Sequence, residues 1–175
     1  MGLKPSQLKK YLRIAIPNRF ATLITGPPGI GKTDIVNQVF QELNNPLVTV
    51  HPVGSSPSDF EGYLMIVKGI PQFVPFGAMK EIIDSKVPTG FFIDDFGQAP
   101  PAVQAACMRP LLAHRTNSHI IPDHVVFIVA SNRRQDKAGV MGLLEPVKSR
   151  FITIIELSVD VEDWVDWAML NSMPS

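Results

Sequence analysis

The chain has 175 residues, of which 45% are hydrophobic and 18% charged, and Lys plus Arg equal Asp plus Glu at 16 each. This composition excludes a disordered polyelectrolyte, and a single domain of this length buries roughly 70% of the surface of its unfolded chain. A pI of 6.9 gives no indication of the basic surface that binding to duplex nucleic acid usually requires.

The sequence also indicates a compartment. Cys107 is the only cysteine, so no disulfide can form within the chain. No apolar run approaches the ~20 residues that span a bilayer. Lys9, Lys10 and Arg13 interrupt the N-terminal segment where a signal peptide needs an apolar stretch. We therefore expect a soluble cytoplasmic protein that does not bind a membrane.

Short β-branched runs alternate along the chain with longer amphipathic stretches. This alternation predicts an α/β fold, in which a parallel sheet is covered by helices on both faces. The expected strands are nearly continuously apolar, as strands buried on both faces should be. They are residues 21–25, 47–51, 90–93, 125–130 and 152–157. The prediction is a three-layer domain with a five-stranded, mostly parallel sheet.

Helices are expected between these strands from the spacing of apolar residues. The first is predicted at 6–16, with Ser6 as its N-cap and Pro17 as its end. The others are predicted at 32–43, 76–85, 101–112 and 142–147. Residues 63–74 read as a β-hairpin that projects from the domain, with Pro71 on a strand edge.

Eight consecutive residues match the pattern G-x-x-x-x-G-K-[ST]: Gly26, Pro27, Pro28, Gly29, Ile30, Gly31, Lys32 and Thr33. The glycines let the backbone curl so that successive N–H groups point at phosphate oxygens, and the following helix adds the positive end of its dipole. We expect Lys32 to reach the β- and γ-phosphates and the Thr33 hydroxyl to coordinate Mg²⁺. The alternative is a glycine-rich turn with no ligand.

The pair Asp94-Asp95 ends an apolar strand. Two adjacent carboxylates at a buried strand end need a cation or water to compensate their charge. In a phosphate-loop protein, Asp94 would hold Mg²⁺ through water, and Asp95 would polarise the attacking water. The alternative is a solvated turn that begins at Asp94.

Two further polar residues lie next to expected strands. Asn132 follows strand 125–130, where its amide could orient water against the γ-phosphate. Arg150 lies between the short helix and the last strand. By themselves, Asn132 could belong to a plain turn, and Arg150 could be a cation at a helix end.

In this order the motifs resemble those of the AAA+ ATPases. Residues 26–33 are similar to a Walker A loop, residues 91–95 to Walker B, Asn132 to sensor 1 and Arg150 to an arginine finger. Within the family, the chain looks most like the MoxR-type branch, on the segments 51–62, 98–104 and 144–151. The resemblance runs from about residue 19 to residue 168.

The resemblance divides the chain into three segments. They are an N-terminal helix at 1–18, an α/β nucleotide-binding core at 19–158 and the start of a truncated helical lid at 159–175. The rest of the lid, with its sensor 2 arginine, has no counterpart in the sequence. The family usually has Glu after the Walker B Asp, whereas this chain has Asp95, whose side chain is shorter by a methylene.

The resemblance implies a protein that binds ATP and Mg²⁺ and hydrolyses ATP between neighbouring subunits of a homo-oligomeric ring. Asp95 and Asn132 would place the attacking water, and Arg150 would act on the next subunit. Turnover would serve to remodel an unidentified partner protein. An ATP-binding switch with little hydrolysis is one alternative. A small-molecule P-loop kinase is another, although the basic lid that such a kinase needs is not found.

Overall fold

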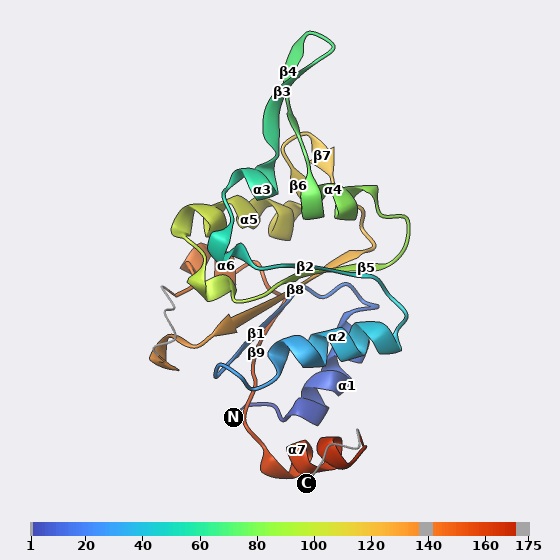
Figure 1. Ribbon diagram of the computed structural model, residues 1–175, viewed down its shortest axis with the longest axis vertical. Helices are drawn as coiled ribbons and strands as arrows, with labels where there is room; N and C mark the ends of the chain where they lie inside the picture. Colours follow the sequence, from blue (N-terminus) through green and yellow to red (C-terminus); the bar gives the residue numbers. More distant parts are fainter. Residues whose placement is uncertain (1, 137–141, 171–175) are drawn as a thin grey trace.

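The computed structural model describes residues 2–136 and 142–170. Within these ranges, a sheet of five strands lies between two layers of helices (Figure 1). Its strand order is β2-β5-β8-β1-β9, and every neighbouring pair is parallel. The strands are β1 (Thr22–Gly26), β2 (Leu47–Val50), β5 (Thr89–Ile93), β8 (Val125–Asn132) and β9 (Thr153–Glu156). The predicted α/β fold and its five strands are confirmed.

Alternate residues of the central strands face opposite helical layers. On β8, Val125, Phe127 and Val129 pack in one apolar cluster, whereas Val126 and Ile128 pack in the other. The first cluster is covered by α3 (Ser58–Glu61), α4 (Gly77–Asp84), α5 (Pro101–Ala113) and α6 (Glu145–Lys148). The second is covered by α1 (Pro5–Ala15) and α2 (Lys32–Glu42). All of β8 is buried, which explains why its residues 125–130 are continuously apolar.

The predicted helices are present, and most differ from prediction only at their ends. The expected N-cap at Ser6 is wrong, because α1 starts at Pro5 and its N-cap residue is Lys4. Proline suits the first helical turn, where its missing N–H would have no intrahelical partner. The helix predicted at 142–147 starts later, at Glu145, where Pro146 again occupies the first turn.

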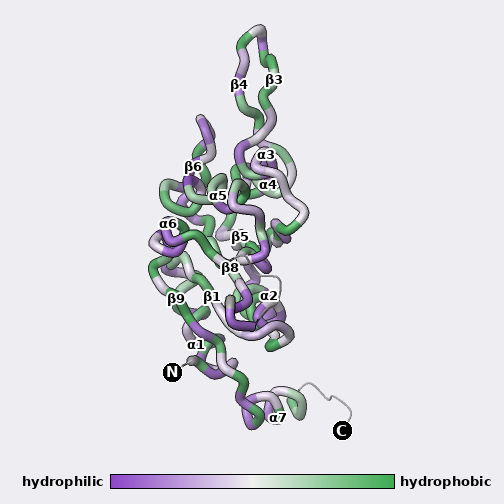
Figure 2. The backbone as a smooth tube through the Cα atoms, turned by 90° about the vertical axis from the view of Figure 1, so that its left-hand side faces the viewer, coloured by the Kyte–Doolittle hydropathy of each residue, from purple (hydrophilic) through white to green (hydrophobic). Residues whose placement is uncertain are grey.

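The predicted hairpin consists of β3 (Tyr63–Val67) and β4 (Ile70–Val74), which pair antiparallel. It stands away from the rest of the chain (Figures 1 and 2). The ring of Tyr63 stacks on that of Phe76 at a centroid distance of 4.5 Å, which anchors the base of the hairpin. A smaller hairpin is formed by β6 (Arg115–Thr116) and β7 (His119–Ile120). Both hairpins lie outside the central sheet.

The last described helix, α7 (Val161–Leu170), lies beside the start of α1 (Figure 1). Ser6 donates from its backbone N–H and its hydroxyl to Asp163, and Lys4 pairs with Asp160 at 2.7 Å. The division at residues 18 and 158 stays a prediction, and residues 171–175 of its third segment lie outside the described residues. No helix in the described ranges is long and apolar enough to cross a membrane.

The packing of β5 against α2 yields a testable prediction. Gly90 pairs with Leu47, and a Cβ atom on Gly90 would overlap the Phe40 ring. Gly90→Ala should therefore destabilise the fold by about 1–3 kcal/mol, the usual cost of overpacking a core. The midpoint of denaturant unfolding measures the effect. Gly54→Ala is the control, because nothing lies within 4 Å of the added Cβ, and an equal loss in both variants would contradict the packing argument.

Candidate functional site

The sheet order brings three chemically important segments to one edge. Strands β5, β8 and β1 are neighbours and parallel, so their carboxyl ends lie side by side. Gly26 at the end of β1 is in register with Asn132 at the end of β8. Asp94 and Asp95 directly follow β5. Side chains that are far apart in the sequence therefore meet at this edge.

The loop between β1 and α2 has the backbone conformation that its glycines were expected to allow. Gly29 and Gly31 have φ angles of 73° and 88°, and Gly31 is the N-cap residue of α2. A Cβ at either position would meet no atom within 4 Å, so the left-handed backbone, rather than crowding, favours glycine here. The loop thus directs the N-terminus of α2, with its unpaired N–H groups, toward the same edge.

Lys32 lies in the first turn of α2 and is only 6% exposed. Its Nζ donates to the carbonyl of Pro27 at 2.8 Å, to the carbonyl of Gly26 at 3.1 Å and to Asn132 Oδ1 at 2.8 Å. Burial lowers the pKa of Lys32, and the nearby carboxylates of Asp95 and Asp94 oppose that shift. The ammonium group is thus held in a fixed place, close to two acids.

Thr33 and Asp94 bring two side-chain oxygens together beside Lys32. The Thr33 hydroxyl donates to Asp94 Oδ2 at 2.6 Å, and Asp94 Oδ1 accepts from the Asp95 N–H at 2.9 Å. Hydroxyl and carboxylate oxygens fit Mg²⁺, which usually takes one or two protein ligands and completes its shell with phosphates and water. Among the described residues no cluster of three or more His, Cys, Asp or Glu could form an all-protein metal cage.

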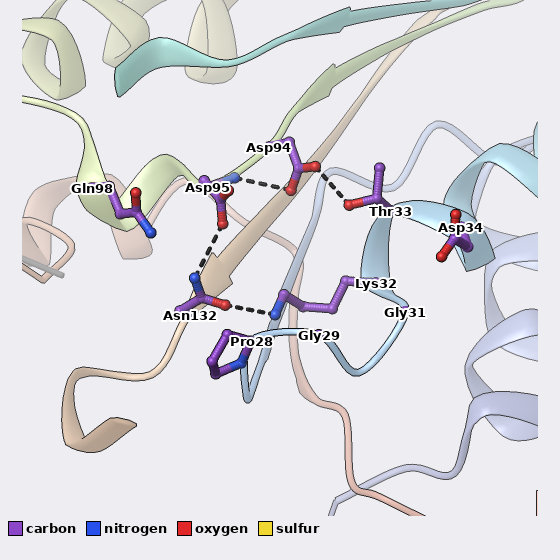
Figure 3. Close-up of a pocket in the computed structure, with 10 residues that line it drawn as sticks. All are labelled: Pro28, Gly29, Gly31, Lys32, Thr33, Asp34, Asp94, Asp95, Gln98 and Asn132. Carbon is purple, nitrogen blue, oxygen red and sulfur yellow. Dashed lines mark hydrogen bonds between the residues drawn. The ribbon is translucent and has the colours of Figure 1, made fainter. Parts of the chain in front are cut away.

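Asn132 connects the lysine to the second acid, as Figure 3 shows. Its Oδ1 accepts from Lys32, and its Nδ2 donates to Asp95 Oδ1 at 3.1 Å. Asp95 itself has a φ of 52°, a left-handed conformation that costs free energy in a non-glycine residue. The amide of Asn132 therefore fixes the orientation of the Asp95 carboxylate.

These groups line a cavity of about 380 Å³. Its lining consists of Pro28, Gly29, Gly31, Lys32, Thr33, Asp34, Asp94, Asp95, Gln98 and Asn132. Sequence reasoning assigned no site role to Asp34 or Gln98. It also overlooked His51, whose Nδ1 lies 4.0 Å from Asp94 Oδ2. His51 directly follows β2, which is adjacent to β5. Its position at the carboxyl end of a predicted strand could therefore have identified it from the sequence.

Arg133 is a further residue that sequence reasoning did not use. Its guanidinium makes two 2.9 Å hydrogen bonds to Asp136 and one of 2.7 Å to Glu156 on β9. These bonds raise the pKa of Arg133, with the Asp136 bond as the larger cause. They tie the chain just after Asn132 to β9, another strand of the same sheet.

Arg150 does not line the cavity. It follows α6, where its backbone N–H donates to the Val147 carbonyl at 3.0 Å. Its Nε is buried and has no hydrogen-bond partner within the described part of the chain. The structure thus brings together Lys32, Thr33, Asp94, Asp95 and Asn132, but it leaves Arg150 outside the cavity of its own chain.

Comparison with known proteins identifies the family to which these motifs belong. Residues 21–151 match the family described as AAA domain (dynein-related subfamily). This region contains the phosphate loop, both aspartates, Asn132 and Arg150. No curated protein matches the chain.

Solved structures share the fold. The Holliday junction branch migration motor RuvB of Thermotoga maritima superposes with a TM-score of 0.63 at 18% identity, over 96% of this chain and 50% of RuvB. NtrX of Brucella abortus, solved with ADP, gives 0.64 at 17% identity, over 95% of this chain and 39% of NtrX. The chain therefore spans half or less of the length of these two proteins, and at such identities the likeness concerns the fold alone.

The geometry around Lys32 leads to a prediction about nucleotide affinity. Lys32→Ala should weaken ATP binding by about 100-fold or more, because truncating a buried, charged hydrogen-bond donor typically costs several kcal/mol. Calorimetric titration with MgATP measures the loss. Lys80→Ala is the matched control, since Lys80 is exposed and pairs with Asp84 on the same helix, α4. Unchanged affinity in Lys32→Ala would rule out the phosphate-loop assignment.

Proposed function

Because the chain belongs to the AAA domain family of the dynein-related subfamily, we propose that it binds ATP with Mg²⁺ in the 380 Å³ cavity and hydrolyses it. The observation that carries the proposal is the convergence of a buried lysine, an oxygen pair and an amide-held carboxylate on one cavity next to the phosphate loop. The loop from Gly26 to Thr33 would bind the phosphates of ATP, and those of ADP after hydrolysis.

Each group has a place in nucleotide binding. The backbone N–H groups of the loop and the N-terminus of α2 would bind the phosphate oxygens, with Lys32 supplying the positive charge near the terminal ones. Thr33 and Asp94, already 2.6 Å apart, would hold the metal ion. Mg²⁺ supplies charge that neutralises the phosphates in the transition state.

Asp95 and Asn132 are suited to hold the attacking water. Both line the cavity, and the amide of Asn132 donates to one carboxylate oxygen of Asp95. A carboxylate in a fixed orientation can accept a hydrogen bond from water and set its direction toward the γ-phosphate. In-line positioning of this kind is most of what an enzyme contributes to phosphoryl transfer.

The position of Arg150 supports action between subunits. It lies outside its own cavity, so a role in catalysis requires a neighbouring copy of the chain whose cavity it can reach. We infer a homo-oligomeric ring of the MoxR-like branch, in which ATP turnover remodels a partner protein. The segments 51–62, 98–104 and 144–151 support this branch by their resemblance to it.

A second candidate function is an ATP-binding switch that hydrolyses slowly. The length of Asp95 favours it, because the family usually has Glu at this position and a shorter side chain sets the carboxylate farther from the phosphate. Measuring ATP affinity and steady-state turnover separately discriminates the two. Tight binding with turnover at background level, in the assembled protein, would favour the switch.

Lengthening Asp95 tests its role directly. Asp95→Glu should leave ATP affinity unchanged and raise turnover severalfold, because the added methylene moves the carboxylate toward the phosphate. Asp95→Asn, which keeps the size of the side chain and removes its charge, should lower turnover by about 100-fold or more. Phosphate release at saturating ATP is the measurement. A slower Asp95→Glu enzyme with unimpaired assembly would argue against this role.

The role of Arg150 is tested by mixing variants. Arg150→Ala should bind ATP normally but turn over about 10³-fold more slowly, the effect measured for arginine fingers elsewhere. Mixing it with Lys32→Ala, whose Arg150 is intact, should restore part of the activity at the mixed interfaces.

A purely structural Arg150 predicts a different outcome. As a cation at a helix end it would contribute only about 0.3–1 kcal/mol of stability, and mixing would restore nothing. Native mass spectrometry must show that the two variants assemble together. If co-assembled and well-folded variants remain inactive, Arg150 does not act in trans.

A further inference from the structure

Gln104 is a polar residue of α5, and it is only 1% exposed. Its Nε2 donates to the Ala99 carbonyl at 3.1 Å and to the Gly142 carbonyl at 3.0 Å. Its Oε1 accepts from the Leu144 N–H at 3.0 Å. Both ends of the amide are thus used, and all three partners are backbone groups.

One of these bonds leads back to the candidate catalytic acid. Ala99 directly follows the 3-10 turn η2 (Phe96–Gln98), which begins after Asp95. The Ala99 N–H donates to the Phe96 carbonyl at 3.0 Å, and the Gln98 N–H donates to the Asp95 carbonyl at 2.9 Å. Gln104 is therefore anchored on the turn that holds Asp95.

The other two bonds lead to Arg150. Leu144 is the N-cap residue of α6, and its carbonyl accepts from Val147 at 2.9 Å and from Lys148 at 3.2 Å. The Arg150 N–H in turn donates to the Val147 carbonyl at 3.0 Å. Gln104 thus holds the first residue of the turn that carries Arg150.

The short length of α6 makes this anchor important. The helix has four residues, and Val147 is its only buried one within the described structure. A helix of this length is not stable by itself, so tertiary contacts must determine its position. An amide fully hydrogen-bonded in the core is expensive to move, since any displacement would leave buried groups unpaired.

We propose that Gln104 is a positioning residue that couples the turn after Asp95 to α6, and so determines where Arg150 is presented to the next subunit. The inference rests on the proposed function, because it assumes that Arg150 acts in trans. Loss of the amide should impair hydrolysis in the neighbouring cavity. A Gln104 that merely fills the core would affect only the stability of its own chain.

Two variants test the donor and acceptor hydrogen bonds of Gln104 separately. Gln104→Met has a similar volume and no hydrogen-bonding group, whereas Gln104→Glu keeps the acceptor for the Leu144 N–H and loses the Nε2 donor. Hydrogen exchange reports on the bond itself. Exchange at the Leu144 amide should be at least about fivefold faster in Gln104→Met than in the wild type, as expected for a lost hydrogen bond. Exchange at the wild-type rate would overturn the proposal.

The decisive experiment places the change in the chain that donates Arg150. Arg150→Ala is mixed either with Lys32→Ala or with the double variant Lys32→Ala/Gln104→Met, and phosphate release is measured in the co-assembled protein. Both of these Lys32→Ala chains are donors, that is, they supply Arg150 but cannot bind ATP in their own cavity. The measured activity therefore depends only on the Arg150 that they present to the Arg150→Ala chain. The double variant should restore less than about one tenth of the activity that Lys32→Ala restores.

A matched control accounts for lost stability. Cys107 is also on α5 and 1% exposed, so Lys32→Ala/Cys107→Ala removes core packing without touching the Gln104 bonds, and it should restore as much activity as Lys32→Ala does. If Gln104→Met does not fold, Gln104→Glu takes its place in the donor. Equal restoration by the Gln104 donor and by Lys32→Ala would overturn the proposal. No restoration by Lys32→Ala itself would instead refute the trans-acting Arg150.

Discussion

The direction of the strands is the constraint on which the rest of the structure depends. All neighbouring pairs of the central sheet are parallel, and helices cover both faces. Such strands offer polar groups no place along their length, as the fully buried β8 shows. Polar side chains therefore lie where strands end, and parallel strands all end at the same edge. The phosphate loop, Asp94, Asp95 and Asn132 occupy that edge for this reason.

The same edge concentrates buried charge, which the side chains compensate among themselves. Lys32 and Asp94 are only 6% and 5% exposed, and burial lowers the pKa of Lys32. Hydrogen bonds join Lys32 to Asn132, Asn132 to Asp95, and Asp94 to Thr33. A site of this kind is already ordered before a ligand enters, so binding spends little free energy on arranging it.

Helix α5 connects this edge to a part of the chain outside the cavity. It lies against the sheet through residues such as Val103 and Leu111, and its buried Gln104 reaches both the turn after Asp95 and the start of α6. A rigid helix with hydrogen bonds at two places transmits position better than a loop does. Under the proposed function, α5 would relate the water-holding acid of one cavity to the arginine offered to the next.

The sequence by itself determined the elements and the local chemistry. The eight residues of the phosphate loop are consecutive, and glycine spacing and a helix start define their geometry without reference to the rest of the chain. The position of the two acids was also predictable from the sequence. A continuous apolar run that ends in Asp94 and Asp95 indicates a buried strand and the point at which it ends. Helix ends are harder to predict: Ser6 is expected to be the N-cap, but the helix starts at Pro5 and its N-cap residue is Lys4.

Only the tertiary structure decided which of these groups meet. The bond from Lys32 to Asn132 joins residues 100 positions apart, and the bonds from Ser6 to Asp163 span 157. Local periodicity identifies strands but not their order, and it is the order β2-β5-β8-β1-β9 that places Asn132 beside the phosphate loop. In the sequence, Gln104 is, with Arg109, one of two strongly polar residues in a mostly apolar helix. Its function as an anchor exists only because folding brings Ala99, Gly142 and Leu144 within hydrogen-bonding distance of a single amide.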